Sequence, residues 1–344
     1  MIPPATGRPM PGLLVLVGLL LQAVAPAADK VYILPPGTLR DPTVLSGGEI
    51  KDYSGAGLVY QSANGNTRRY PASHVLRVET QWLPEHRRGE ELFAKGKLEQ
   101  ALAAYREAQR RETRRWVRRR LMAEQVWCLQ NLGRWQPAAE LFLVLYGEDP
   151  QTPYFECIPV AWAPMTPQPP LVAKAQRWLA SEDGVRVVLG ASYLMHTPHR
   201  ARALSRVNQL RFHRDGRVAA LATTLWWQGR LHQVEPEGVK SWEQDLRRFP
   251  ARLRAGGHWV LAQAHARLFQ PQRSVLHLLR IPVLYPKHRA LAARALLQAA
   301  GQLQRLGQRR EATRLLQELA IQYDSTPEAD QARQMLRQQA QPSR

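Results

Sequence analysis

A spacing of 37 residues recurs in two parts of this 344-residue chain and limits what it can fold into. Gly96 and Tyr105 reappear 37 positions later as Gly133 and Phe142. In both copies the glycine precedes a segment whose apolar residues are three or four positions apart, as on one face of a helix. Periods of 20 to 50 residues are typical of stacked helical units that pack mainly against their neighbours. The sequence therefore predicts a helical array rather than a sheet-centred domain.

The repeated positions have different packing tasks. The glycine supplies the tight turn within a helix pair, a small residue lets paired helices touch, and an aromatic ring fills the groove to the next unit. A weaker copy lies 37 residues before Ala312, around Val275, with Gln270 in place of the turn glycine. The signature residues are Gly89, Gly96, Ala101, Tyr105, Gly133, Ala138, Phe142, Gly307 and Ala312.

This pattern resembles the tetratricopeptide repeat (TPR) of exported bacterial proteins. The resemblance covers residues 85–149 and 290–337, and more loosely 255–289. A looser likeness to HEAT-type repeats comes from Asp183-Gly184 and Asp215-Gly216, each of which precedes an apolar helical segment. The resemblance implies a mainly α fold, an α-solenoid of TPR- and HEAT-like helix pairs, with a concave face that binds a protein or peptide.

The first 28 residues have the features of a secretory signal. Arg8 is followed by an apolar run from Gly12 to Ala25, and the run ends in small residues. This order is typical of a signal peptide, and the run is shorter than the ~20 residues of a membrane-spanning helix. An uncleaved anchor is the alternative. We expect an exported chain, periplasmic or secreted, cleaved near Ala28 and without a transmembrane span after cleavage.

Short β-prone runs separated by glycine-rich turns predict a small β unit over residues 29–80. The turns include Gly47-Gly48 and Asn64-Gly65. Asn-Gly is a strong hairpin signal because both turn residues of a two-residue hairpin need positive φ. The unit resembles an SH3- or Sm-like barrel. Its expected role is either to bind a partner or to cap the helical part.

Seven prolines in residues 150–170 interrupt the helical pattern. Proline removes a backbone donor and blocks helices, so we expect a linker or an ordered surface loop there. The predicted organisation is a signal peptide at 1–28, a small β unit at 29–80, two TPR-like repeats at 81–149, a Pro-rich linker at 150–171, a HEAT-like helical segment at 172–254 and C-terminal TPR-like repeats with a capping helix at 255–344.

Positive charge dominates the chain, with 48 Lys and Arg against 28 Asp and Glu. Between Asp245 and Glu311 there are thirteen basic residues and no acidic ones. A denser arginine run supplies candidate anion-binding residues: Arg110, Arg111, Arg114, Arg115, Arg118 and Arg119. Such charge favours anionic partners, so an anionic polymer or lipid head groups are the alternative to a protein partner. Nucleic acid is disfavoured because the aromatic residues stand at packing positions and do not alternate with the basic ones.

No motif predicts catalysis or a bound cofactor. The chain lacks a phosphate loop, a dinucleotide fingerprint and a nucleophile elbow. His196 and His199 are one helical turn apart, but Pro198 lies between them and no third ligand is near, so no metal site is expected. An enzyme would require these histidines to converge with Glu182 and Asp183.

Three further histidines and two cysteines leave smaller questions. His258 and His265 are seven positions apart on one predicted helix face, beside His277, and we interpret them as polar residues of a groove. Cys128 and Cys157 could pair in an oxidising compartment, and their spacing leaves this open. The predicted function is a non-catalytic scaffold or assembly factor of the cell envelope.

Overall fold

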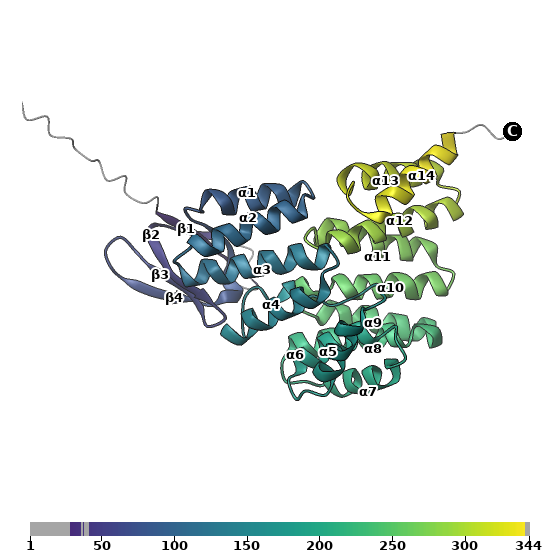
Figure 1. Cartoon of the computed structure of the whole chain (residues 1–344), viewed down its shortest axis with the longest axis horizontal. Coiled ribbons are helices and arrows are strands. Elements are labelled where there is room, and N and C mark those ends of the chain that lie inside the picture. The colour runs from purple at the N-terminus through teal and green to yellow at the C-terminus, as the bar shows by residue number, and fades with distance from the viewer. Residues whose placement is uncertain (1–27, 36, 38–40, 341–344) are drawn as a thin grey trace, which may run out of the picture.

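The structure is a computed structural model that describes residues 28–35, 37 and 41–340. Within these residues the chain is mainly helical, with fourteen α-helices that follow a five-stranded antiparallel sheet (Figure 1). The predicted signal peptide, apart from Ala28, lies outside the described residues. None of the described helices combines the length and the hydropathy needed to cross a bilayer.

The sheet has the strand order β4-β3-β2-β1-β5, so the last strand returns beside the first. Its strands are β1 (Asp29–Ile33), β2 (Thr43–Ser54), β3 (Gly57–Gln61), β4 (Thr67–Tyr70) and β5 (Val75–Glu79). β2 pairs with β1 and with β3 through irregular registers, which bend a strand. The β3–β4 connection runs from Ser62 to Asn66. Within it Gly65 takes a positive φ of 83°, whereas Asn64 does not. The predicted hairpin at Asn64-Gly65 is confirmed, because β3 and β4 pair antiparallel, but the connection is longer than a two-residue turn.

Consecutive helices pack against one another within α1–α4, within α5–α8 and within α10–α14, and α9 packs on α10. The first eight are α1 (Pro84–Ala94), α2 (Leu98–Arg111), α3 (Arg115–Asn131), α4 (Trp135–Glu148), α5 (Pro169–Leu179), α6 (Gly184–Leu194), α7 (Arg200–Leu210) and α8 (Gly216–Gly229). The last six are α9 (Pro236–Arg248), α10 (Ala255–Arg267), α11 (Pro271–Leu284), α12 (Arg289–Arg305), α13 (Arg309–Gln322) and α14 (Pro327–Ala340).

The repeated glycines lie in the turns between paired helices. Gly96, Gly133 and Gly307 have φ values of 73°, 71° and 76°, a region that glycine adopts readily. On α1, a Cβ at Gly89 would lie 2.5 Å from the ring of Tyr105, so only glycine allows this contact between α1 and α2. The remaining signature residues are buried: Ala101, Tyr105, Ala138, Phe142 and Ala312.

The weaker repeat copy is displaced by one residue from the 37-residue step. Phe269, with φ 55°, occupies the turn position two residues before α11, where Gln270 was expected. Ser274 correspondingly takes the small buried position expected at Val275. Helices α11 and α12 have the same lengths as α2 and α3. The connection from α11 to α12, however, is one residue longer than that from α2 to α3. Counting in steps of 37 residues therefore places the turn at Gln270, one residue too late.

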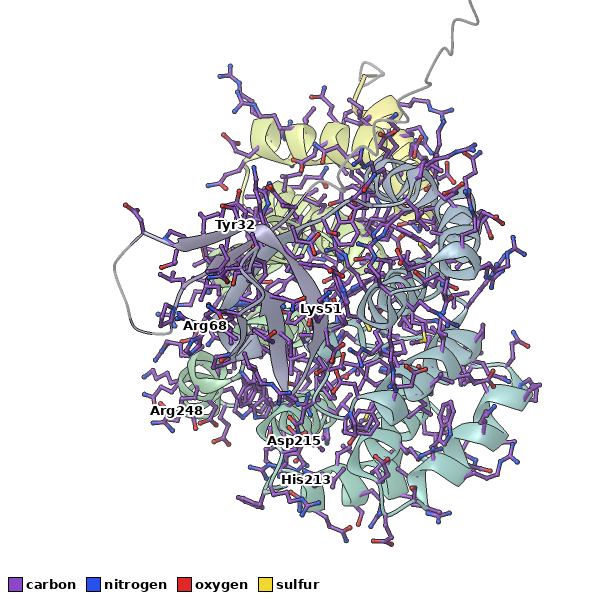
Figure 2. The ribbon with its side chains drawn as sticks, turned by 90° about the vertical axis from the view of Figure 1, so that its left-hand side faces the viewer. Tyr32, Lys51, Arg68, His213, Asp215 and Arg248 are labelled. Atoms are coloured by element: carbon purple, nitrogen blue, oxygen red, sulfur yellow. The ribbon has the colours of Figure 1, made fainter. Side chains whose placement is uncertain are left out.

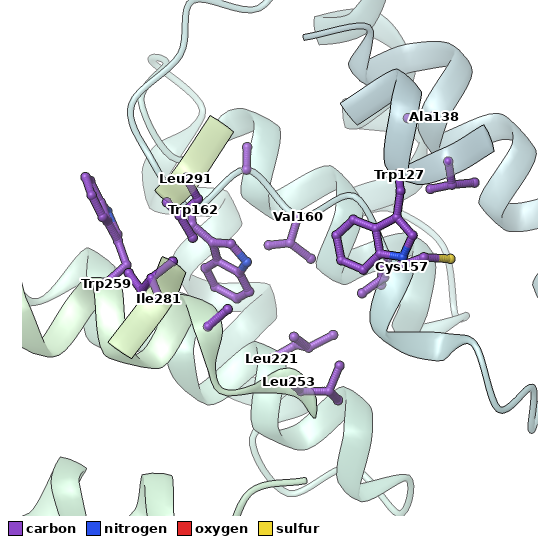
Figure 3. Packing of buried hydrophobic residues seen from close by; sticks show 14 of the residues in the cluster. Trp127, Ala138, Cys157, Val160, Trp162, Leu221, Leu253, Trp259, Ile281 and Leu291 are labelled. Atoms are coloured by element: carbon purple, nitrogen blue, oxygen red, sulfur yellow. The ribbon is translucent and has the colours of Figure 1, made fainter. Parts of the chain in front are cut away.

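The irregular segment between α4 and α5 lies inside the molecule. Ile158, Val160 and Trp162 are buried. Figure 3 shows Val160 and Trp162 between Trp127 of α3 and Trp259 of α10. This differs from the linker or surface loop that we expected. Proline prevents helix formation but does not prevent burial, and the apolar residues between the prolines supply a buried surface.

Side chains from four helices satisfy the backbone of this buried segment. Amide groups of Gln130 (α3) and Gln228 (α8) donate to the carbonyls of Cys157 and Trp162, each at 3.1 Å. Tyr193 of α6 donates to the carbonyl of Pro159 at 2.6 Å. Arg294 of α12 donates to the carbonyl of Pro164 at 3.2 Å. Cys157, Pro159 and Trp162 are buried, so their carbonyls need such partners because they have lost water, whereas Pro164 is exposed.

The two cysteines are free in the structure. Cys128 lies in α3 and Cys157 in the irregular segment, and both side chains are buried. Burial raises the pKa of both thiols, so both are protonated at neutral pH.

The sheet packs against α3 through Arg119. This buried guanidinium forms an ion pair with Asp52 of β2 and donates to the carbonyl of Tyr53 at 3.0 Å. A second connection runs from the backbone of Gly55 to Asp149 at 2.9 Å. Figure 2 looks onto this end of the molecule, where Lys51 marks β2 and Asp215 marks the start of α8 below the sheet.

Replacement of Arg119 should loosen the sheet. Arg119→Ala removes the buried contacts with Asp52 and Tyr53, so we expect the free energy of unfolding to fall by about 1.5–3 kcal/mol. Urea unfolding followed by circular dichroism measures it. Arg118→Ala is the control, because Arg118 is exposed and forms no ion pair with any described residue. Equal effects of the two substitutions would contradict this role of Arg119.

Two helical glycines should respond in opposite directions to alanine. At Gly256 of α10 a Cβ would lie 2.3 Å from the ring of Trp162, so Gly256→Ala should destabilise the protein by about 1–3 kcal/mol through overpacking. At Gly301 of α12 a Cβ meets nothing within 4 Å, so Gly301→Ala should stabilise it by about 0.5–1 kcal/mol. Thermal unfolding of both variants tests whether the irregular segment is packed as described.

Candidate functional site

The predicted anion-binding arginines do not form one free surface. Arg119 is buried against the sheet, and Arg114 pairs with Glu112 at 2.9 Å while donating to the carbonyl of Gln81. Arg110 and Arg111 pair with nearby glutamates, Glu107 and Glu85. Arg115 and Arg118 are exposed and form no ion pair with any described residue. The run mainly connects helices to one another and to the sheet.

The structure does not bring together the acidic and histidine side chains that an enzyme in this region would require. Asp183 caps the start of α6, where its carboxylate accepts from the backbone of Val185 at 2.8 Å. His196 follows the other end of that helix, about 20 Å away at 1.5 Å per residue. His199 contacts Gln176 instead, at 2.5 Å.

A different set of titratable side chains meets where α10 packs against α9 and α11. Glu243 comes from α9, His258 and His265 from α10, and His277 from α11. The seven-residue spacing of the two α10 histidines places them on one face, two turns apart. All three imidazoles are buried, and the side chain of Glu243 is 27% exposed.

The four side chains form a continuous chain of polar contacts. Glu243 Oε1 lies 2.9 Å from His265 Nε2 and 3.5 Å from His277 Nε2. The second nitrogen of His265 contacts Gln270 Oε1 at 2.8 Å, and the Nδ1 atoms of His258 and His277 are 3.0 Å apart. The rings of His265 and His277 are stacked, with centroids 5.3 Å apart.

This cluster lies beside a cavity of about 530 Å³ between the three helices. Glu243, His258 and His277 line it, and so do the partly exposed apolar side chains of Leu276 and Leu284. Four arginines also line it: Arg247, Arg254, Arg273 and Arg280. None of these four forms an ion pair with a carboxylate in the described part of the chain, and Glu243 is the carboxylate that lines the cavity with them.

The environment sets the charge of the cluster. Burial, together with the positive charge that His277, Arg280 and Arg254 place nearby, lowers the pKa of His258 to about 3. Burial, His265 and Arg280 lower the pKa of His277 to about 4, against the opposing effect of Glu243. Burial raises the pKa of Glu243, but hydrogen bonds from His265 and His277 outweigh it, and the net pKa is lowered. At neutral pH the cluster therefore combines a carboxylate with neutral His258 and His277.

Glu243, His265 and His277 place a carboxylate oxygen and two imidazole nitrogens within 4.8 Å of one another. Such a set can hold a metal ion, and no other group of three or more His, Cys, Asp or Glu does so among the described residues. The spacing of the three histidines is visible in the sequence, but Glu243 was not predicted. No local signal points to it, because it lies on a different helix, α9, and only helix packing brings it to the histidines.

Acid should destabilise the protein through the buried histidines. The unfolded chain binds protons on His258 and His277 near pH 6.5, whereas the folded chain binds them only near pH 3–4. The free energy of unfolding should therefore fall as the pH drops from 6.5 to 4, by up to about 1.4 kcal/mol per pH unit for each histidine. Above pH 7 these two histidines should cause no change in it.

Urea unfolding between pH 4 and 8, with chelator present, measures this slope. His258→Gln should flatten the slope, because it removes one of the histidines whose pKa is lowered by burial. His232→Gln should leave it unchanged, because His232 is exposed. A slope that is the same in all three proteins would assign the acid sensitivity to other groups.

Comparison with known proteins adds no assignment. The chain matches no protein-family model, and a search of the curated proteins found no similar sequence.

Proposed function

We propose that this protein is a non-catalytic interaction protein that binds an acidic segment of a partner protein in the cavity between α9, α10 and α11. One observation carries the proposal: four arginines without carboxylate partners border a cavity that also exposes Leu276 and Leu284. In the arginine run at residues 110–120, by contrast, most guanidinium groups are already paired.

The chemistry of the cavity favours a peptide over a flat anionic surface. Guanidinium groups bind carboxylates through two parallel hydrogen bonds, which gives geometry as well as attraction. Leu276 and Leu284 would bury apolar atoms of the same segment. A volume of about 530 Å³ holds a few side chains, as in other small recognition sites. Acidic residues alternating with apolar ones would match this lining.

The wider architecture belongs to the same proposal. Helix pairs joined by left-handed glycines support a TPR- and HEAT-like α-solenoid, and the return of β5 beside β1 supports an SH3- or Sm-like unit. Export rests on the composition of residues 1–28. Together these features favour a scaffold or assembly factor in the cell envelope.

Affinity capture tests the proposal with two matched variants. The exported chain is used to capture envelope proteins, the beads are washed at low and then at high salt, and the retained proteins are identified by mass spectrometry. Arg247→Gln with Arg273→Gln removes two charges at the cavity. Arg305→Gln with Arg310→Gln removes two exposed charges from the α12–α13 region.

A partner that stays bound at high salt, and is lost only from the cavity variant, is the expected result. Loss from both variants, or release of all bound material by salt, would favour the alternative of an anionic polymer or lipid. That outcome follows because counterion-driven binding weakens steeply with salt and depends on total charge. Retention by the cavity variant equal to that of the unmodified chain would exclude this cavity as the site.

A further inference from the structure

We propose that Glu243, His265 and His277 form a binding site for a divalent transition-metal ion, with Zn²⁺ as its representative. The ligand atoms are Oε1 of the carboxylate and Nε2 of both imidazoles. This site is independent of the proposed peptide partner, because it needs no residue from outside the chain.

The distances suit a small ion with nitrogen and oxygen ligands. Ligand atoms at about 2.0–2.1 Å from a tetrahedral zinc lie about 3.3 Å from one another. Here the carboxylate oxygen is 2.9 Å from one imidazole nitrogen and 3.5 Å from the other. Three side chains on three different helices therefore already converge to within small side-chain adjustments of a coordination sphere.

Groups behind both histidines orient them for this role. Gln270 Oε1 is positioned to accept the Nδ1 hydrogen of His265 at 2.8 Å. His258 Nδ1 is likewise positioned to accept the Nδ1 hydrogen of His277 at 3.0 Å. A bound ion selects this tautomer in place of the Nε2–H hydrogen bonds to the carboxylate, and each histidine then presents the lone pair of Nε2 to the ion beside Glu243. Metal-binding histidines typically donate their second nitrogen hydrogen to such a partner, which fixes the ring and its tautomer.

The turn before α11 helps to place one of these groups. Gln270 follows Phe269, whose φ of 55° is unusual for a residue other than glycine and whose side chain is 92% exposed. This conformation begins α11 directly after the turn and sets Gln270 against His265 on the preceding helix.

The site has three protein ligands and access from the cavity. Glu243 and His277 line the cavity, while His265 is almost fully buried behind them. Three protein ligands leave one position of a tetrahedral ion for water or for an anionic group. The surrounding arginines repel cations that are held by charge alone. The two imidazoles should therefore favour Zn²⁺, Co²⁺ or Ni²⁺ over Mg²⁺ and Ca²⁺, which prefer oxygen ligands.

Direct metal binding tests the proposal. The purified chain, carried on a tag without histidine, is stripped with chelator and titrated with ZnCl₂ by calorimetry at pH 7.5. We expect one Zn²⁺ per chain and no saturable binding of MgCl₂ or CaCl₂. Addition of Zn²⁺ should raise the unfolding temperature of the chain, because an ion that binds only the folded state stabilises it.

Three variants locate the ion. Glu243→Gln keeps the size of a partly exposed side chain and removes its charge, and it should weaken Zn²⁺ binding by at least 100-fold. Gln270→Ala removes the partner of His265 and should weaken binding about 10- to 100-fold. His232→Asn removes an exposed histidine elsewhere and should change nothing.

Unfolding curves without metal show which variants are folded, and Glu243→Gln is expected to remain folded. The proposal is overturned if the unmodified chain binds no Zn²⁺, or if Glu243→Gln binds it as tightly as His232→Asn does. The peptide partner is absent from this experiment, so its failure leaves the proposed function to be judged by the capture experiment alone.

Discussion

Burial of the irregular segment between α4 and α5 is the constraint on which the helical part of this molecule depends. Val160 and Trp162 fill the space between α3 and α10, which are far apart in sequence. An irregular backbone in that place needs a partner for each carbonyl that has lost water, and α3, α6 and α8 each supply one. Apolar burial and hydrogen bonding in this segment therefore link helices that are far apart in the sequence.

This arrangement explains how the N-terminal helices reach the C-terminal ones. Asn131, at the end of α3, donates to the carbonyl of Lys287 and accepts from the backbone of Ala290, both near the start of α12. Lys287 in turn pairs with the buried carboxylate of Glu124 at 2.6 Å. A polar residue of one helix thus satisfies the free backbone group at the start of another, 159 positions later.

The same helices determine where unpaired charge is left. In the arginine run around α2 and α3, carboxylates of the sheet and of α1 and α2 lie close enough to pair with most guanidinium groups. Around α9–α11 the acidic residues all lie in or just before α9, and none of them forms an ion pair with Arg247, Arg254, Arg273 or Arg280 beside the cavity. Density of arginine in the sequence was therefore a poor guide to unpaired positive charge, because pairing depends on which carboxylates the fold brings near.

The sequence alone determined the local features: helix pairs, turn glycines such as Gly96 and Gly133, and a small β unit before them. These follow from the spacing of apolar residues and from the φ that a tight turn requires, and both are properties of neighbouring residues. Only the tertiary structure decided that residues 158–163 are buried, that Phe269 takes the turn position, and that Glu243 meets His265 and His277. Each of these depends on loop lengths and on contacts between distant helices, which no local periodicity encodes.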